Sequence, residues 1–146
     1  MKRGFRLASV LRARQAQEDA ARGEVLRARR GAALAAEAVK ARDSKLANHE
    51  GPDDDTARAV VAALTARQAM AASLAMARQL ATLAEVQVAE RSGELTEAAQ
   101  RRRTVEKLAE RHAEQVRRHD QQTDQQALDE LATTAAQRAA AREVRS

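Results

Sequence analysis

The sequence predicts an all-α protein: an antiparallel two-helix coiled-coil hairpin whose second helix is longer than the first. Three observations lead to this prediction. Almost every residue is a good helix former, with Ala, Arg, Gln, Glu and Leu predominating. The only proline, Pro52, lies beside Gly51 in one short polar segment. Before that segment a 3-4 spacing of apolar and small residues continues for about six heptads, which is typical of a coiled coil.

The first helix is expected over about residues 5–48. Its seam consists of Leu7, Leu11, Arg14, Glu18, Ala21, Val25, Ala28, Ala32, Ala35, Val39, Arg42 and Leu46. Leu26 and Leu34 lie off this line and are expected to widen the apolar stripe. Alanine buries little area, and burial contributes roughly 25 cal/mol per Å². The sequence therefore predicts a thin, marginally stable coiled coil and not a compact core.

The break between the helices is expected at residues 49–55. Gly51 can take the left-handed conformation that ends a helix, and Pro52 cannot continue one. The next residues, Asp53–Asp55 and Thr56, supply N-cap candidates. The acidic ones also place negative charge beside the positive end of the next helix dipole.

The second helix is expected over about residues 56–143. Its apolar signal is carried first by Val60, Leu64, Leu74, Leu80, Leu83, Val88 and Leu95, with Met70 and Met76 as flexible fillers, and then thins to Val105, Leu108, Val116, Leu128 and Leu131. Ser92 and Gly93 mark a point where the helix could kink. On the basic stretch that follows, Arg102 is expected to pair with Glu106, one turn away.

The two predicted helices differ in length by a factor of about two, roughly 65 Å against 130 Å at 1.5 Å per residue. Antiparallel pairing from the turn sets Leu7 opposite the region from Leu95 to Ala99. We therefore expect a single coiled-coil domain, residues 1–146, with an overhang over about residues 100–143. This overhang is either a frayed or dimerising tail or a prong that enters another protein.

Composition excludes several classes of protein. The chain has no cysteine, so disulfides and thiolate metal sites are absent. No stretch approaches the roughly 20 apolar residues that span a bilayer, and no apolar run of signal-peptide length follows the basic N-terminus. A cytoplasmic location is the default expectation.

No catalytic constellation is present, and we expect neither an enzyme nor a cofactor or small-molecule ligand. His112 and His119 share a helix face but are seven residues apart, whereas helical metal pairs use a spacing of three or four. The net charge of +5 attracts phosphates, but the chain has one aromatic residue and no DNA-reading motif. Nucleic acid is therefore not an expected partner.

Three segments together resemble the flagellar FliJ family. The opening Phe5-Arg6-Leu7-Ala8-Ser9-Val10-Leu11-Arg12-Ala13-Arg14-Gln15-Ala16-Gln17-Glu18 has the family's aromatic-x-Leu, Val/Leu-Leu pair, Arg and Glu. The stretch from Arg101 to His112 resembles its basic run followed by Glu-Lys-Leu-x-x-Arg, and the stretch from Asp124 to Ala132 its terminal Gln-x-x-Leu-Asp-Glu-x-Ala. The chain departs from the family where Gln126 replaces a frequent Lys and where Ala replaces larger apolar residues.

The resemblance implies an antiparallel coiled coil similar in shape to the γ stalk of rotary ATPases, within the flagellar type III export apparatus. Its implied partners are the hexameric export ATPase, the membrane export gate protein and export chaperones. Its implied location is cytoplasmic, peripherally at the inner face of the cell membrane. Protein contacts are expected at these positions: Phe5, Leu7, Leu11, Arg14, Arg101, Arg102, Arg103, Leu128, Asp129 and Glu130.

Two other interpretations stay open at this point. One is a free-standing, self-associating coiled-coil scaffold that uses the overhang to dimerise. The other is the equivalent stalk of a virulence secretion system, with the same fold in a different apparatus.

Overall fold

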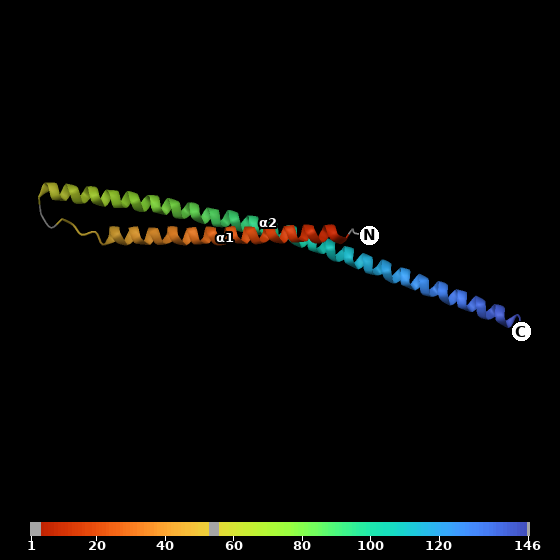
Figure 1. The fold of residues 1–146 in the computed structure, drawn as a ribbon. Helices are drawn as coiled ribbons and strands as arrows, with labels where there is room; N and C mark the ends of the chain where they lie inside the picture. The colour runs from red at the N-terminus through yellow and green to blue at the C-terminus, as the bar shows by residue number, and fades with distance from the viewer. Residues whose placement is uncertain (1–3, 53–55, 146) are drawn as a thin grey trace. The chain divides into compact units, whose positions relative to one another are not determined.

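A computed structural model describes the backbone of residues 4–52 and 56–145. It contains helix α1, Gly4–Ala47, and helix α2, Ala57–Glu143, and no strand within those ranges (Figure 1). The second helix is about twice as long as the first. The predicted all-α fold class, with two helices and a longer second one, is therefore confirmed.

Contacts between residues group the chain into two units. One unit, Arg14–Arg101, contains most of α1, the linker and the first half of α2; we call it the hairpin unit. The other, Met1–Ala13 with Arg102–Ser146, contains the start of α1 and the second half of α2; we call it the terminal unit. The expectation of a single domain stays a prediction.

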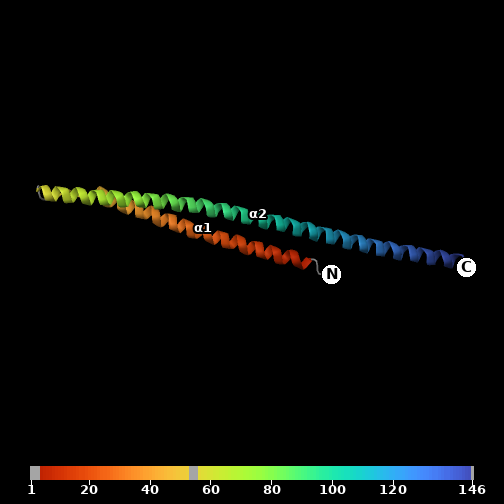
Figure 2. The same ribbon diagram turned by 90° about the horizontal axis from the view of Figure 1, so that it is seen from above.

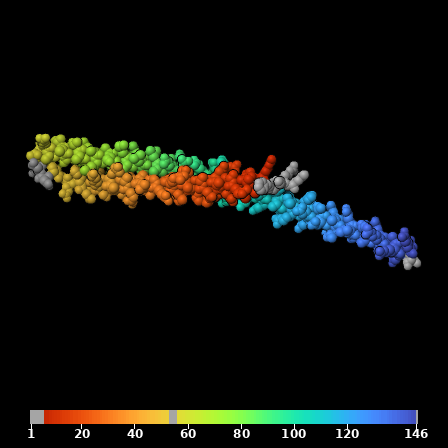
Figure 3. Space-filling model, in the orientation of Figure 1, coloured from red at the N-terminus to blue at the C-terminus, as the bar shows by residue number. Residues whose placement is uncertain are grey.

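In the hairpin unit the two helices lie side by side and run in opposite directions (Figures 1 and 2). Arg42 Nε donates a hydrogen bond of 3.0 Å to Ser73 Oγ. Arg78 Nη2 lies 3.5 Å from Asp43 Oδ1. Both contacts cross from one helix to the other, and the space-filling view shows the side chains of the two helices meeting along this stretch (Figure 3).

The antiparallel register differs from the predicted one. Because Arg42 stands opposite Ser73, the same register sets Leu7 opposite Leu108 and not opposite Leu95–Ala99. The reason is that the first turns of α2 continue past the end of α1, so they have no residue of α1 opposite them (Figures 1 and 2). The contacts within the terminal unit agree with this register, since they group the start of α1 with the part of α2 that begins at Arg102.

The core is a narrow seam dominated by alanine. In α1 every predicted seam residue is buried or half-buried except Arg42, which is exposed. In α2 the inward residues keep the same 3-4 spacing and are Ala63, Ala66, Met70, Leu74, Ala77, Ala81, Ala84 and Val88. The most buried apolar residues are Val25, Ala32, Leu74 and Ala77. The seam also contains one buried charged residue, Glu18, which is 7 % exposed and pairs with Arg22 at 2.9 Å.

Several large apolar residues that were expected to form the stripe lie outside the seam. Leu26 and Leu34 do not widen it, because they are 51 % and 73 % exposed. In α2 the outward group is Val60, Leu64, Met76, Leu80 and Leu83. The physical reason is periodicity: the alanines of α2 hold the 3-4 line, and these larger side chains fall beside it.

Side chains and backbone end the helices locally. Thr56 Oγ1 accepts a 3.3 Å hydrogen bond from the Ala59 amide, so Thr56 caps α2 as one of the predicted candidates. The other candidates, Asp53–Asp55, lie outside the described residues. Gly51 does not act as expected: α1 already ends at Ala47, the Asn48 amide donates to the Ser44 carbonyl at 2.9 Å, and Gly51 has no positive φ.

One hydropathy result corrects the sequence analysis. α2 contains an 18-residue window with a mean hydropathy of 1.4, which is apolar enough by length and composition to cross a membrane. We expected no such stretch, but alanine raises the hydropathy of the window without forming a large apolar run. A coiled-coil helix of this composition passes the same test, so the window assigns no membrane role by itself.

The position of the seam predicts that Leu-to-Ala substitutions at two positions of α2 change the free energy of unfolding by different amounts. Leu74→Ala removes a side chain that is 5 % exposed, and we expect it to lower the free energy of unfolding by about 2 kcal/mol. Leu83→Ala in the same helix removes a side chain that is 60 % exposed, and its effect should stay below about 0.5 kcal/mol. Urea unfolding followed by circular dichroism measures both; equal losses would contradict the alanine seam.

Candidate protein-binding surfaces

The four predicted N-terminal contact residues lie in α1. Leu7, Leu11 and Arg14 are half-buried positions of the seam, and the side chain of Phe5 lies outside the described residues. Arg14 Nη1 donates a 3.0 Å hydrogen bond to Gln17 Oε1, one turn further along. These three residues thus have a packing role inside the protein, and their contact with another protein stays a prediction.

The arginine block divides between two faces of α2. Arg101 is exposed and lies 3.5 Å from Glu97. Arg102 has a side chain only 22 % exposed and pairs with Glu106 at 2.7 Å, as the sequence indicated. Arg103 is exposed. A helix rotates about 100° per residue, so three consecutive arginines cannot share one face; Arg101 and Arg103 are the two that a partner can reach.

The last arginine of the block and the next two cations at intervals of four form an exposed row, which we call the cationic ladder. Arg103, Lys107 and Arg111 follow one another at intervals of four, which places them on one face of α2, and all three are exposed. Sequence reasoning counted these charges without assigning them a face. A ladder of this kind suits an acidic surface of another protein.

Beyond the ladder, every described residue from Ala113 to Arg145 is exposed. We call residues 113–145 the free segment. Arg102, Val105, Glu106, Ala109 and His112 are still half-buried, so the overhang is shorter than the expected range of about 100–143. The shift in register explains the difference, because α1 accompanies α2 further than the sequence suggested.

The predicted contact residues Leu128, Asp129 and Glu130 lie in the free segment. Leu128 is 61 % exposed, and Leu131, one turn further on, is 68 % exposed. Asp129 Oδ1 accepts a 3.1 Å hydrogen bond from Gln125 Nε2. The hydroxyls of Thr133 and Thr134 donate 2.8 Å hydrogen bonds to the carbonyls of Asp129 and Glu130, one turn back in the same helix.

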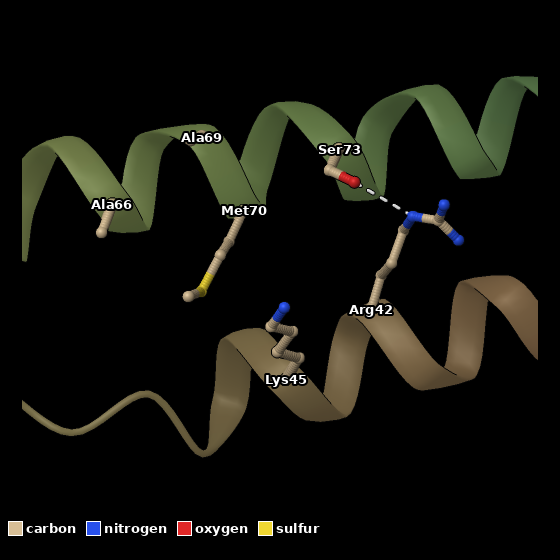
Figure 4. A pocket seen from close by; sticks show the side chains of 6 residues that line it. All are labelled: Arg42, Lys45, Ala66, Ala69, Met70 and Ser73. Atoms are coloured by element: carbon tan, nitrogen blue, oxygen red, sulfur yellow. Dashed lines mark hydrogen bonds between the residues drawn. The ribbon is translucent and has the colours of Figure 1, made fainter.

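A second surface lies in the hairpin unit, where the outward leucines meet small residues of α1. One apolar groove is lined by Ala35, Ala38, Met76, Ala77 and Leu80, with Arg42 and Ser73 at its end. A neighbouring groove is bordered by Arg42 and Lys45 of α1 and by Ala66, Ala69, Met70 and Ser73 of α2 (Figure 4). Sequence reasoning found the apolar stripe of Met70 to Leu83 but not the alanine floor opposite it.

The charged pairs of the hairpin unit are structural. Arg27 donates a hydrogen bond to Glu24, which lowers the pKa of that carboxyl, and the pairing raises the pKa of Arg27. Arg91 pairs in the same way with Glu94 at 2.9 Å, which raises the pKa of Arg91. The partners of each pair are one turn apart on an exposed helix face, and pairs with this spacing stabilise the helix that carries them.

Metal-ligand geometry is absent from the part of the chain that the structure describes. No three side chains of His, Asp or Glu there converge on a point that could hold an ion. His112 is half-buried and His119 is exposed, with Asp120 Oδ1 3.9 Å from His119 Nδ1.

The fold defines a class of protein: a two-helix coiled coil with long exposed helix faces. The chain belongs to the FliJ family, because the family described as "Flagellar FliJ protein" matches residues 1–141. Neither the curated proteins nor the solved structures contain a match. Members of this family are components of the flagellar type III export apparatus and serve motility; they are structural, chaperone-like proteins and not a family of enzymes.

The arginine block generates a prediction about stability. Arg102→Ala removes a half-buried ion pair and the packing of a long stem, and we expect it to lower the free energy of unfolding by about 1 kcal/mol. Arg103→Ala removes only an exposed cation and should stay within about 0.5 kcal/mol of the parent chain. Thermal unfolding of both variants tests this; a larger loss for Arg103→Ala would mean that the two faces are assigned the wrong way round.

Proposed function

We propose that this protein is the stalk of the flagellar export ATPase: its free segment enters the hexameric ring, promotes ring assembly and hydrolysis, and its hairpin unit links the ring to the membrane export gate and to export chaperones. In this proposal the protein works in the cytoplasm, at the inner face of the cell membrane. The family supports a role in flagellar export. The proposed role as the stalk of the ATPase ring rests on the free segment.

The observation that carries the proposal is the exposure of residues 113–145. The helical part of this segment, residues 113–143, forms about 47 Å of helix at 1.5 Å per residue, which the rest of the described chain leaves uncovered. A single helix without a partner gains no burial from its own fold, and helices are held mainly by tertiary packing. A ring of subunits around the helix would supply that packing.

A mechanism follows from the asymmetry of one helix. A stalk with one cationic ladder, Arg103, Lys107 and Arg111, and one acidic segment around Asp129 and Glu130 cannot meet six identical subunits in the same way. Each subunit would contact a different face. Differential contacts shift the populations of the subunits' conformations, which is how a stalk can favour assembly and successive hydrolysis.

Contacts with the gate or with chaperones are assigned to the apolar groove of the hairpin unit. Met76 and Leu80, 66 % and 60 % exposed, form its wall, and Ala35 and Ala38 form a floor that lets another helix approach closely. Apolar anchors at helical spacing over small residues suit an amphipathic helix. In this proposal the groove binds the gate or chaperones, and the free segment binds the ATPase ring.

Removing the free segment tests the stalk. We expect a chain that ends at His112 to keep the seam, because all buried and half-buried residues precede residue 113. It should retain its helical unfolding transition and lose stimulation of ATP hydrolysis by the cognate export ATPase. The full chain should stimulate hydrolysis to a plateau near one chain per six ATPase subunits.

Two results would contradict this part of the proposal. One is a folded, truncated chain that stimulates as well as the full chain. The other is a plateau at one chain per ATPase subunit, which would indicate peripheral binding. The charge-reversal variant Arg103→Glu, which leaves the seam intact, is the matched full-length test and should weaken stimulation.

The groove has a separate test. Leu80→Lys places a charge on the groove wall at an exposed position and should leave folding and ATPase stimulation unchanged. We expect it to reduce binding to the isolated cytoplasmic part of the gate protein or to an export chaperone at least tenfold, measured by calorimetry. Leu34→Lys, a control at a 73 % exposed leucine outside the groove, should bind normally. Equal loss in both variants would refute the groove.

A further inference from the structure

One face of the free segment has a pattern of charges that reverses about its centre. Its members are Asp120, Asp124, Ala127, Leu131, Ala135, Arg138 and Arg142. At about 100° per residue they all lie within roughly 40° of the direction of Leu131. All seven are exposed. We call this line of residues the 120–142 face.

The spacing of the face is the same in both directions from Leu131. Alanines stand four residues to either side, Asp124 and Arg138 stand seven to either side, and Asp120 and Arg142 stand eleven to either side. Every acid therefore has an arginine at the mirrored position. The steps of four, three and four give an eleven-residue repeat, which keeps a stripe on one side of a nearly straight helix.

We propose that a second copy of this chain docks antiparallel on the 120–142 face, with Leu131 of the two copies meeting on the two-fold axis. Asp124 of each copy then faces Arg138 of the other, and Asp120 faces Arg142 of the other. Each alanine at 127 meets the alanine at 135. This arrangement forms four intermolecular ion pairs around a small apolar centre and needs no other partner.

The same charges oppose a parallel arrangement. In parallel register Asp124 would face its own copy, and Arg138 likewise, which places like charges together along the whole face. The pattern thus selects one orientation by repulsion as well as by attraction.

The charged groups of the face are available for an intermolecular partner. Within residues 4–52 and 56–145 no ion pair involves Asp124, Arg138 or Arg142. Elsewhere on the same helix arginines do pair with acids one turn away, for example Arg118 with Glu114. Between residues 120 and 142 the nearest acid and arginine of this face, Asp124 and Arg138, are separated by about four turns, too far to reach each other within one chain.

The inferred dimer is weak and competes with other partners. The face extends over about 33 Å and buries one leucine and two alanines from each copy, so the interface belongs to the small, transient class. It uses the segment that the stalk proposal places in the ATPase ring. Self-association would then shield the segment in the free protein, although the dimer itself does not depend on the stalk role.

Charge reversal of full-length chains tests the inference. We measure association by sedimentation equilibrium at low salt. Asp124→Arg brings arginines together at both ends of the interface, and Arg138→Asp brings aspartates together; each should weaken the dimer at least tenfold. The double variant in one chain restores opposite charges and should recover the dimer. An equimolar mixture of the two single variants should also associate, because both pairs are then complementary.

Controls separate this inference from the stalk proposal. Asp129→Arg reverses a charge on the opposite side of the helix from Leu131, so it should leave self-association unchanged whatever its effect on ATPase stimulation. A parent chain that is monomeric at millimolar concentration would overturn the inference. Single variants that associate like the parent chain, or a double variant that does not recover, would overturn it as well.

Orientation has its own readout because the chain contains no cysteine. Under oxidation Leu131→Cys should form a covalent dimer, since the two positions meet on the axis. Ala127→Cys alone should not, because antiparallel copies hold these positions about 12 Å apart along the axis. A mixture of Ala127→Cys and Ala135→Cys chains should cross-link. Efficient cross-linking of Ala127→Cys to itself would indicate parallel pairing and refute the proposal.

Discussion

The alanine seam between α1 and α2 is the constraint on which the rest of the structure depends. Alanine lets two helix backbones approach closely, but each buried alanine removes little apolar area from water compared with a leucine. Among the residues whose burial the structure describes, the buried apolar ones are Val25, Ala32, Leu74 and Ala77, so the hairpin draws its stability from many small contacts along the seam. Continuity of the 3-4 spacing therefore matters more than any single large side chain, and a buried Glu18 is tolerated because Arg22 pairs with it.

A seam of small residues leaves the larger ones for other uses. In an ordinary globular domain Met76, Leu80 and Leu83 would form the core. Here all three lie outside the seam, and Met76 and Leu80 border a groove whose floor is again alanine. In α2 every described residue beyond His112 is exposed, and local pairs such as Gln125–Asp129 are the contacts found there. The seam that makes the hairpin thin thus also leaves large side chains and a long helical segment exposed.

The sequence predicted the helices and the α1 seam because both depend on local chemistry, namely propensity, one Gly-Pro break and a sustained spacing. It did not predict the antiparallel register, because alanine positions are interchangeable and the linker's path is not encoded in any one residue. It also assigned Leu80 and Leu83 to the stripe, since a large apolar residue is the usual mark of a core position. Arg102 shows how far sequence reasoning reaches at a candidate site. Its pairing with Glu106 could be predicted from their spacing of four residues, whereas its half-burial could not be predicted without the correct antiparallel register.

A protein with so few large apolar contacts can still select the orientation of a partner helix through the order of acidic and basic residues along its surface. On the free segment the acids at 120 and 124 are about four turns or more from the arginines at 138 and 142, so these groups cannot pair with one another within one helix. Exposed ion pairs are individually weak and are screened by salt. In the proposed dimer, four such pairs arranged about Leu131 would select one orientation. Their individual weakness would also let the two copies separate when a partner that buries more apolar area binds the same segment.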